Sequence, residues 1–124
     1  MGQVQAGRLT RTVWGLGSLT TVLVFGQAVL AGQRLAGVDV VDIHEMISHV
    51  LFGLSLVLAV VAVIAWRRGQ LARWIGLVGA PGLFILMTAQ AFAGYMRLFE
   101  VHVPLGAGLF GLALVVTVGA WPKR

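Results

Sequence analysis

The sequence predicts an all-α fold: an integral membrane, antiparallel four-helix bundle made of two helical hairpins that repeat in parallel across the bilayer. Three observations predict it. First, 59% of the 124 residues are hydrophobic and only 10% are charged, whereas soluble domains have about 45–50% apolar residues. Second, four apolar stretches reach the length of about 20 residues that a membrane-spanning helix needs. Third, a motif at the start of the second stretch returns at the start of the fourth.

The four predicted spans follow one another with short connections, at about 13–32, 44–66, 73–95 and 102–121. The first span comes after Arg8 and Arg11, a pattern that secretory signal peptides share. Its apolar run is longer than the signal-peptide core of about 7–15 residues, so we favour a retained helix. Because the connections are too short to hold a site, residues 1–124 are predicted to form a single transmembrane domain, with any function inside the helices or at their ends.

Basic residues lie mainly on one side of the predicted membrane. That side would carry Arg8, Arg11, Arg67, Arg68, Arg73, Lys123 and Arg124. Only Arg34 and Arg97 lie on the other side, together with all four acidic residues. Because arginine and lysine favour cytoplasmic loops, we expect both termini in the cytoplasm of a multi-pass cell-membrane protein. The net charge of +5 is then a consequence of topology, and the predicted partner is the lipid bilayer, not a nucleic acid.

A gapless internal repeat relates residues 42–57 to residues 100–115. Both segments begin with an acid, an aliphatic residue and a histidine, and both contain Leu-Phe-Gly-Leu. Such parallel repeats are related by an axis along the membrane normal. We therefore expect His44 and His102 at equal depth, near the outer ends of the second and fourth helices. These helices are diagonal in a four-helix bundle, so the two imidazoles can face each other across the core.

Two facing imidazoles suggest an iron site. Neutral histidines on opposite sides of a porphyrin iron give a six-coordinate haem. One turn deeper stand Ser48 and Gly106, small residues that would leave space for a flat ligand. We therefore predict His44 and His102 as metal ligands, with Ser48 and Gly106 as cofactor-contacting residues.

Charged residues near the histidines extend this hypothesis. Arg34 and Arg97 are the basic residues of the outer side, and two arginines could pair with the two haem propionates. Asp42 and Glu100 each stand two residues before a histidine. They are candidates for orienting the ligands or moving protons, and the alternative is that they cap helix N-termini.

His49 differs from the other two histidines. Its counterpart in the repeat is Ala107, and it lies about 140° around the helix from His44. We do not expect it to share a ligand with His44. A zinc site, which needs three or four protein ligands, is therefore disfavoured.

Other intramembrane features are interpreted as packing. Close helix contacts of the small-residue kind are predicted at five glycines: Gly15, Gly17, Gly76, Gly79 and Gly82. Pro81 predicts a kink. Gln27 and Gln90 are expected to form hydrogen bonds between helices.

Short motifs around the histidines resemble a known family. Gln90-Ala-Phe-Ala-Gly followed by Val101-His102-Val is similar to the Gln-x-x-x-Gly run and the helix-four histidine of the heme A synthase family, and Asp42-Ile-His44 resembles its Glu-x-x-His element. Members have two four-helix bundles, each with a histidine pair, and this chain resembles one such half. The resemblance implies a haem-binding bundle with His44 and His102 as axial ligands. In this sequence the acid lies two residues before His44, not three. The resemblance therefore does not assign synthase activity to Asp42.

Several functions remain open at this point. The favoured hypothesis is one non-covalent b-type haem per chain near the outer face, for electron transfer or haem handling, since the absence of cysteine excludes thioether attachment. A homodimer could restore eight spans and act as a heme A synthase-like enzyme. Alternatively, the chain is a structural or assembly subunit of a larger, respiratory-type membrane complex without a cofactor. A haem-binding accessory protein is favoured over a stand-alone enzyme.

Overall fold

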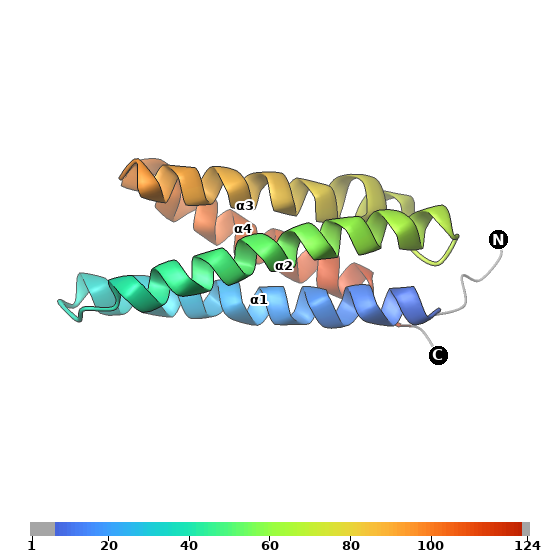
Figure 1. The fold of residues 1–124 in the computed structure, drawn as a ribbon, viewed down its shortest axis with the longest axis horizontal. Helices are drawn as coiled ribbons and strands as arrows, with labels where there is room; N and C mark the ends of the chain where they lie inside the picture. The colour runs from blue at the N-terminus through green and yellow to red at the C-terminus, as the bar shows by residue number, and fades with distance from the viewer. Residues whose placement is uncertain (1–6, 123–124) are drawn as a thin grey trace.

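The computed structural model describes residues 7–122 and contains four long helical segments (Figure 1). They are α1 (Arg8–Leu35), α2 (Val41–Arg67), a short π-helix η1 (Ile75–Gly79) that continues into α3 (Ala80–Tyr95), and α4 (Phe99–Gly119). Each segment is long and apolar enough to cross a membrane, the third as Ile75–Tyr95. The all-α fold is confirmed, and the chain is a multi-pass membrane protein. The first two predicted spans lie within α1 and α2, the third begins two residues before Ile75, and the fourth starts three residues after the beginning of α4 and ends two residues beyond Gly119.

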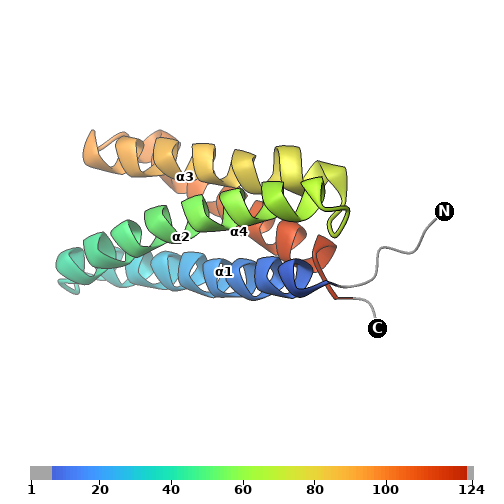
Figure 2. The same cartoon turned by 45° about the vertical axis from the view of Figure 1, so that its right-hand side comes forward.

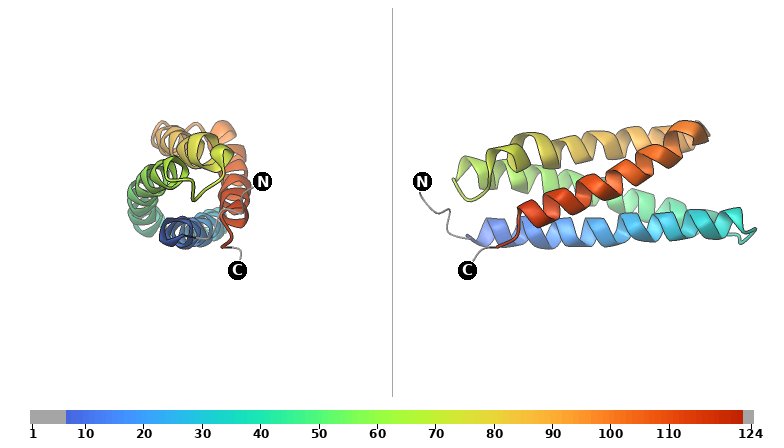
Figure 3. Two further views of the ribbon diagram at one scale, coloured as in Figure 1. Left: turned by 90° about the vertical axis from the view of Figure 1, so that its right-hand side faces the viewer. Right: turned by 180° about the vertical axis from the view of Figure 1, so that it is seen from behind.

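The helices form an antiparallel bundle in which neighbours in sequence are neighbours in space. Helix α1 packs against α2 and α4, and α3 packs against the same two helices. The diagonal pairs are therefore α1 with α3 and α2 with α4, as the end-on view in Figure 3 shows. The α1–α2 and α3–α4 turns lie at one end of the bundle, hereafter the turn end. The α2–α3 connection lies at the other end, beside the start of α1 (Figure 2).

Hydrogen bonds fix the α2–α3 connection to the start of α1. The Thr10 hydroxyl donates to the Gln70 carbonyl, and the Leu9 amide donates to Gln70 Oε1 at 3.2 Å. Side chains from distant parts of the chain also meet here, since the indole rings of Trp14 and Trp121 pack edge to face, 5.6 Å apart. Lys123 and Arg124, which contribute to the predicted cytoplasmic charge, lie outside the described residues.

The buried core fills only part of the bundle's length. Fully buried side chains lie in the half nearer the α2–α3 connection, and the largest are Leu58, Ile75, Leu83, Leu109, Val13 and Val116. Toward the turn end burial stops at Val24 in α1, and it begins only at Leu51 in α2. Throughout 25–50 and 94–108, all of which the structure describes, no side chain is buried. The turn end thus has no closely packed core of its own.

Three of the five predicted glycine contacts are confirmed: Gly17, Gly76 and Gly79. A Cβ atom built on Gly17 would lie 2.7 Å from Thr117 Oγ1, across the α1–α4 contact. A Cβ atom on Gly76 would lie 2.4 Å from Trp66 Cβ. These glycines therefore allow helix backbones to approach closely.

The prediction was wrong for Gly15 and Gly82. A Cβ atom at either position would meet nothing within 4 Å. Gly15 stands two residues from Gly17, about 200° around the helix, so only one of them can face α4. Both glycines lie on open faces of their helices.

Pro81 produces a π-helical turn and not a simple kink. Proline has no backbone N–H, so the carbonyl of Leu77 cannot receive the usual bond from the residue four positions ahead. Just before this point the helix widens, and the Ala80 amide bonds to the carbonyl of Ile75, five residues back. The interruption is thus absorbed within one turn of the third span.

Candidate functional site

The structure brings His44 and His102 together across the bundle. Each lies in the first turns of its helix, with the His44 amide bonded to Val40 O and the His102 amide to Leu98 O. Their ring centres are 6.3 Å apart and the ring planes are inclined by 59°. Because α2 and α4 are diagonal and do not pack against each other, these side chains span the centre of the bundle. The predicted proximity of the two histidines is confirmed.

The imidazole of His102 is held by the main chain of α3. Its Nδ1 lies 3.0 Å from the carbonyl oxygen of Gln90. A carbonyl can only accept, so Nδ1 carries the hydrogen, and in the neutral ring Nε2 keeps a free lone pair. Gly94 makes this arrangement possible, because a Cβ atom there would lie 2.8 Å from His102 Cε1.

His44 is held differently, through its backbone and not through its ring. Its carbonyl accepts hydrogen bonds from Gln27 Nε2 and from Ser48 Oγ, both at 2.9 Å. Within residues 7–122 the imidazole itself makes no hydrogen bond. Leu30-Ala31-Gly32 near the end of α1 resembles Phe92-Ala93-Gly94 near the end of α3, and a Cβ atom added to Gly32 would meet nothing within 4 Å. Within the described residues, the ring of His44 therefore lacks a hydrogen bond like the one that α3 provides for the ring of His102.

One turn deeper than the histidines, glutamine side chains lie against the two small residues predicted to contact the cofactor, Ser48 and Gly106. Gln27 Nε2 donates to Ser48 Oγ at 2.7 Å, and Gln90 Nε2 would lie 2.9 Å from a Cβ atom on Gly106. The expected space beside Gly106 is therefore occupied on one side by the Gln90 amide. Of the two glutamines predicted to form hydrogen bonds between helices, Gln27 does so, through the bonds from its Nε2 atom to α2. The Oε1 atoms of Gln27 and Gln90 are buried and have no partner within residues 7–122.

The charged residues predicted for the site all lie at the turn end. Arg34 belongs to the last turn of α1. Arg97 stands in the α3–α4 turn in the left-handed region, with φ 58°. Both arginines are exposed.

Asp42 and Glu100 are exposed and occupy the first turns of α2 and α4. Within residues 7–122 neither carboxylate accepts a hydrogen bond from a helix N-terminus, so the capping alternative is not realised for Asp42 and Glu100; at α2 the Val41 amide donates to Asp39 Oδ1 instead, at 3.5 Å. A negative charge is nevertheless favourable at a helix N-terminus. Within the described residues neither carboxylate bonds to a histidine, and their proposed part in orienting ligands gains no support from a contact.

His49 lies on the exposed outer face of α2, where its Nδ1 is 2.9 Å from Glu45 O. In the part of the chain that the structure describes, no three histidine, aspartate or glutamate side chains gather in a way that could hold a metal ion.

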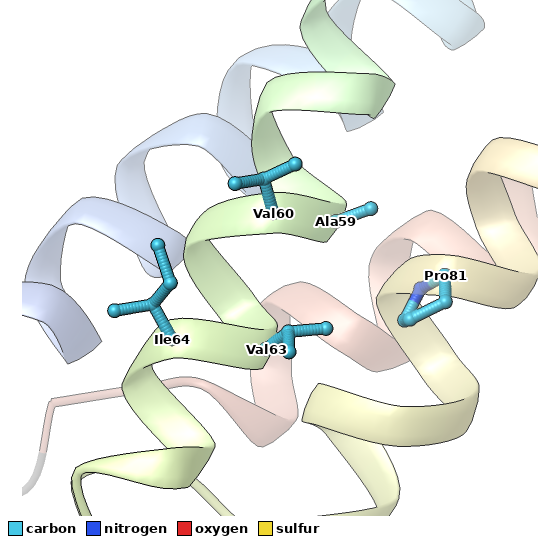
Figure 4. A pocket seen from close by; sticks show the side chains of 5 residues that line it. All are labelled: Ala59, Val60, Val63, Ile64 and Pro81. Atoms are coloured by element: carbon cyan, nitrogen blue, oxygen red, sulfur yellow. The ribbon is translucent and has the colours of Figure 1, made fainter.

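A groove elsewhere on the molecule carries no such chemistry. It lies between α2 and α3 and is lined by Ala59, Val60, Val63, Ile64 and Pro81 (Figure 4). All five side chains are apolar, and the groove lies in the part of the helices that would face lipid. It is a surface for hydrocarbon contact.

Comparison of the chain with protein-family models, with curated proteins and with solved structures gives no match. The resemblance to heme A synthases therefore rests on the motifs in the sequence.

Proposed function

We propose that this chain is a membrane b-type haem protein in which His44 and His102 hold one haem, non-covalently, between α2 and α4 for electron transfer or haem handling. The observation that carries the proposal is the separation of the two imidazoles. Two imidazoles bound in trans to one metal ion have ring centres about 6.2 Å apart, given a metal–nitrogen bond of about 2.0 Å and about 1.1 Å from nitrogen to ring centre. The ring centres of His44 and His102 are 6.3 Å apart.

The state of His102 supports the same function. Histidines that bind metals almost always donate their second ring N–H to a carbonyl or carboxylate, which fixes the tautomer and raises the basicity of the ligand. The Nδ1–H of His102 makes this bond to Gln90 O. Nε2 is the nitrogen that remains for iron.

The distribution of buried residues fits a flat apolar group at the turn end. Apart from Ala93 in α3, burial stops below the histidines, and residues around them such as Ile47 and Leu105 are only half-buried. A porphyrin between the rings would cover these side chains and supply the missing core. The Gln27–Ser48 and Gln90–Gly106 contacts, one turn deeper, would limit how far it enters the bundle.

The remaining residues would have defined tasks around this group. Arg34 and Arg97 are exposed at the turn end, where they can pair with carboxylates at the edge of the macrocycle. When bound, haem supplies one-electron redox chemistry. The buried leucines below the histidines, Leu51, Leu58 and Leu109, exclude water from the rest of the bundle, so a redox partner would act at the turn end.

The turn end is proposed to be the outer face. The described arginines Arg8, Arg11, Arg67, Arg68 and Arg73 belong to the opposite end of the bundle. Since basic residues favour the cytoplasmic side, that end and both termini would be cytoplasmic. The histidine pair then lies toward the outside of a cell membrane.

The function can be tested with single histidine variants purified in mild detergent after haem-sufficient expression. The wild type should show a six-coordinate, low-spin spectrum in absorption and electron paramagnetic resonance. His44→Ala and His102→Ala should each abolish the low-spin signal. His49→Ala is the matched control: the residue lies on α2, is exposed and bonds only to its own helix, so the signal should remain. Loss of the signal in His49→Ala equal to that in the other variants would contradict the ligand assignment.

A further inference from the structure

We propose that the two histidines are unequal ligands: His102 is the fixed one, and His44 gives way so that the site binds a small neutral ligand such as carbon monoxide on its α2 side. This inference rests on the proposed haem site. It concerns a property that a symmetric pair of histidines would not have, namely an exchangeable coordination position.

His102 is fixed by two contacts with α3. The bond from Nδ1 to Gln90 O sets the rotation of the ring, and the backbone at Gly94 closes the space beside it. Loss of such an outer contact typically lowers metal affinity about 10–100-fold. His102 therefore has the features of a permanent ligand.

His44 lacks both contacts although the repeat makes it the counterpart of His102. No hydrogen bond is made by its imidazole within residues 7–122, and a Cβ atom on Gly32, the glycine of the matching Ala-Gly pair in the first hairpin, would meet no described atom within 4 Å, those of His44 included. The Gln27 amide and the Ser48 hydroxyl hold the carbonyl of His44, not its ring. The ring can therefore rotate about its side-chain bonds without breaking a hydrogen bond of the protein.

The surroundings of His44 favour a neutral ligand as its replacement. The residues that precede it, from Gln33 to Asp39 and from Val41 to Ile43, are exposed, so the ring can move outward without entering a packed core. No lysine stands at the turn end, and Arg34 and Arg97 are the cations that the proposed function assigns to the propionates. Carbon monoxide needs neither a charge partner nor a large space.

The first test uses the purified wild-type protein with haem bound, reduced with dithionite and exposed to carbon monoxide. The expected result is a carbon monoxide complex at about one ligand per haem, whose absorption spectrum replaces that of the ferrous form with two histidine ligands. A ferrous spectrum that carbon monoxide does not change would overturn the inference while leaving the haem proposal intact. A wild-type protein that takes up no haem would instead overturn the proposed function, and the inference with it.

The second test compares the two ligand variants by haem content. His44→Ala should retain a five-coordinate, high-spin haem, and added imidazole should restore the low-spin spectrum. His102→Ala should retain less haem than His44→Ala at the same haem concentration. Equal haem retention in the two variants, or greater retention in His102→Ala, would overturn the inference.

A pair of glycine variants tests the cause without removing a ligand. Gly94→Ala places a methyl group 2.8 Å from His102 Cε1, whereas Gly32→Ala, at the matching Ala-Gly pair of the first hairpin, meets nothing within 4 Å. Gly94→Ala should therefore lower haem affinity about tenfold, and Gly32→Ala should leave haem affinity and the spectrum unchanged. Equal effects of the two substitutions would show that the two histidines are held alike and would refute the proposal.

Discussion

The close approach of α2 and η1 depends on Gly76, and replacing this residue by alanine tests how tightly the bundle is packed. A Cβ atom there would lie 2.4 Å from Trp66 Cβ and 3.0 Å from the carbonyl oxygen of Ala62. Carbon atoms pack best at about 3.5–4.0 Å, so the two segments would have to separate by about 1 Å. Neither contacted atom can move by a side-chain rotation, since one is a Cβ and the other belongs to the backbone. Overpacking of this kind costs about 1–3 kcal/mol.

The free energy of unfolding can be measured by titrating the protein from mild detergent into dodecyl sulfate micelles and following its helical circular dichroism. Gly76→Ala should lower this free energy by about 1–3 kcal/mol. Gly15→Ala is the matched control, because its new methyl group meets nothing within 4 Å and alanine is favoured over glycine in a helix by about 0.5–1 kcal/mol. If Gly76→Ala is as stable as Gly15→Ala, the helix contact described here is incorrect.

Two further predictions concern the Gln27 contact and the orientation in the membrane. Ser48→Ala removes an acceptor of the Gln27 side chain and should lower the free energy of unfolding by about 0.6 kcal/mol in the same titration. Ser18→Ala removes a hydrogen bond to the Trp14 carbonyl of its own helix and should have a smaller effect. Equal effects of the two substitutions would contradict a stabilising role for the bond between helices. The chain has no cysteine, so single reporters can be placed in the connections: Val38→Cys should react with a membrane-impermeant maleimide on intact cells, and Ala72→Cys only after permeabilisation. The opposite pattern would reverse the proposed orientation.

Much of the fold could be predicted because a membrane-spanning helix is defined by apolar length. The four spans and their antiparallel order follow from this length and from the short connections, and the repeat then placed His44 opposite His102. The glycine contacts could be predicted only in part. Which face of a helix meets its neighbour depends on rotation about the helix axis, which packing of many side chains determines, and this is why Gly15 was misassigned while Gly17 was not.

The features that distinguish the two hairpins could not be predicted from the sequence. A repeat predicts equivalence, yet the ring of His102 bonds to Gln90 O, whereas among residues 7–122 no hydrogen bond holds the ring of His44. The difference arises from the positions of the main chains of α3 and α1. These positions cannot be predicted from the sequence, since both Gly94 and Gly32 are glycines. The π-helical turn at Ile75–Gly79 is a similar case. Pro81 predicts an irregularity in the helix, but it does not predict that the irregularity is a π-helical turn.

Binding of one haem between His44 and His102 is tested most directly by a reduced-minus-oxidised absorption spectrum of the wild-type protein in mild detergent, with haem quantified as the pyridine haemochrome. We expect a sharp α band and about one b-type haem per chain. A colourless protein that is folded, stable and purified after haem-sufficient expression would contradict it and would favour a structural subunit of a larger membrane complex.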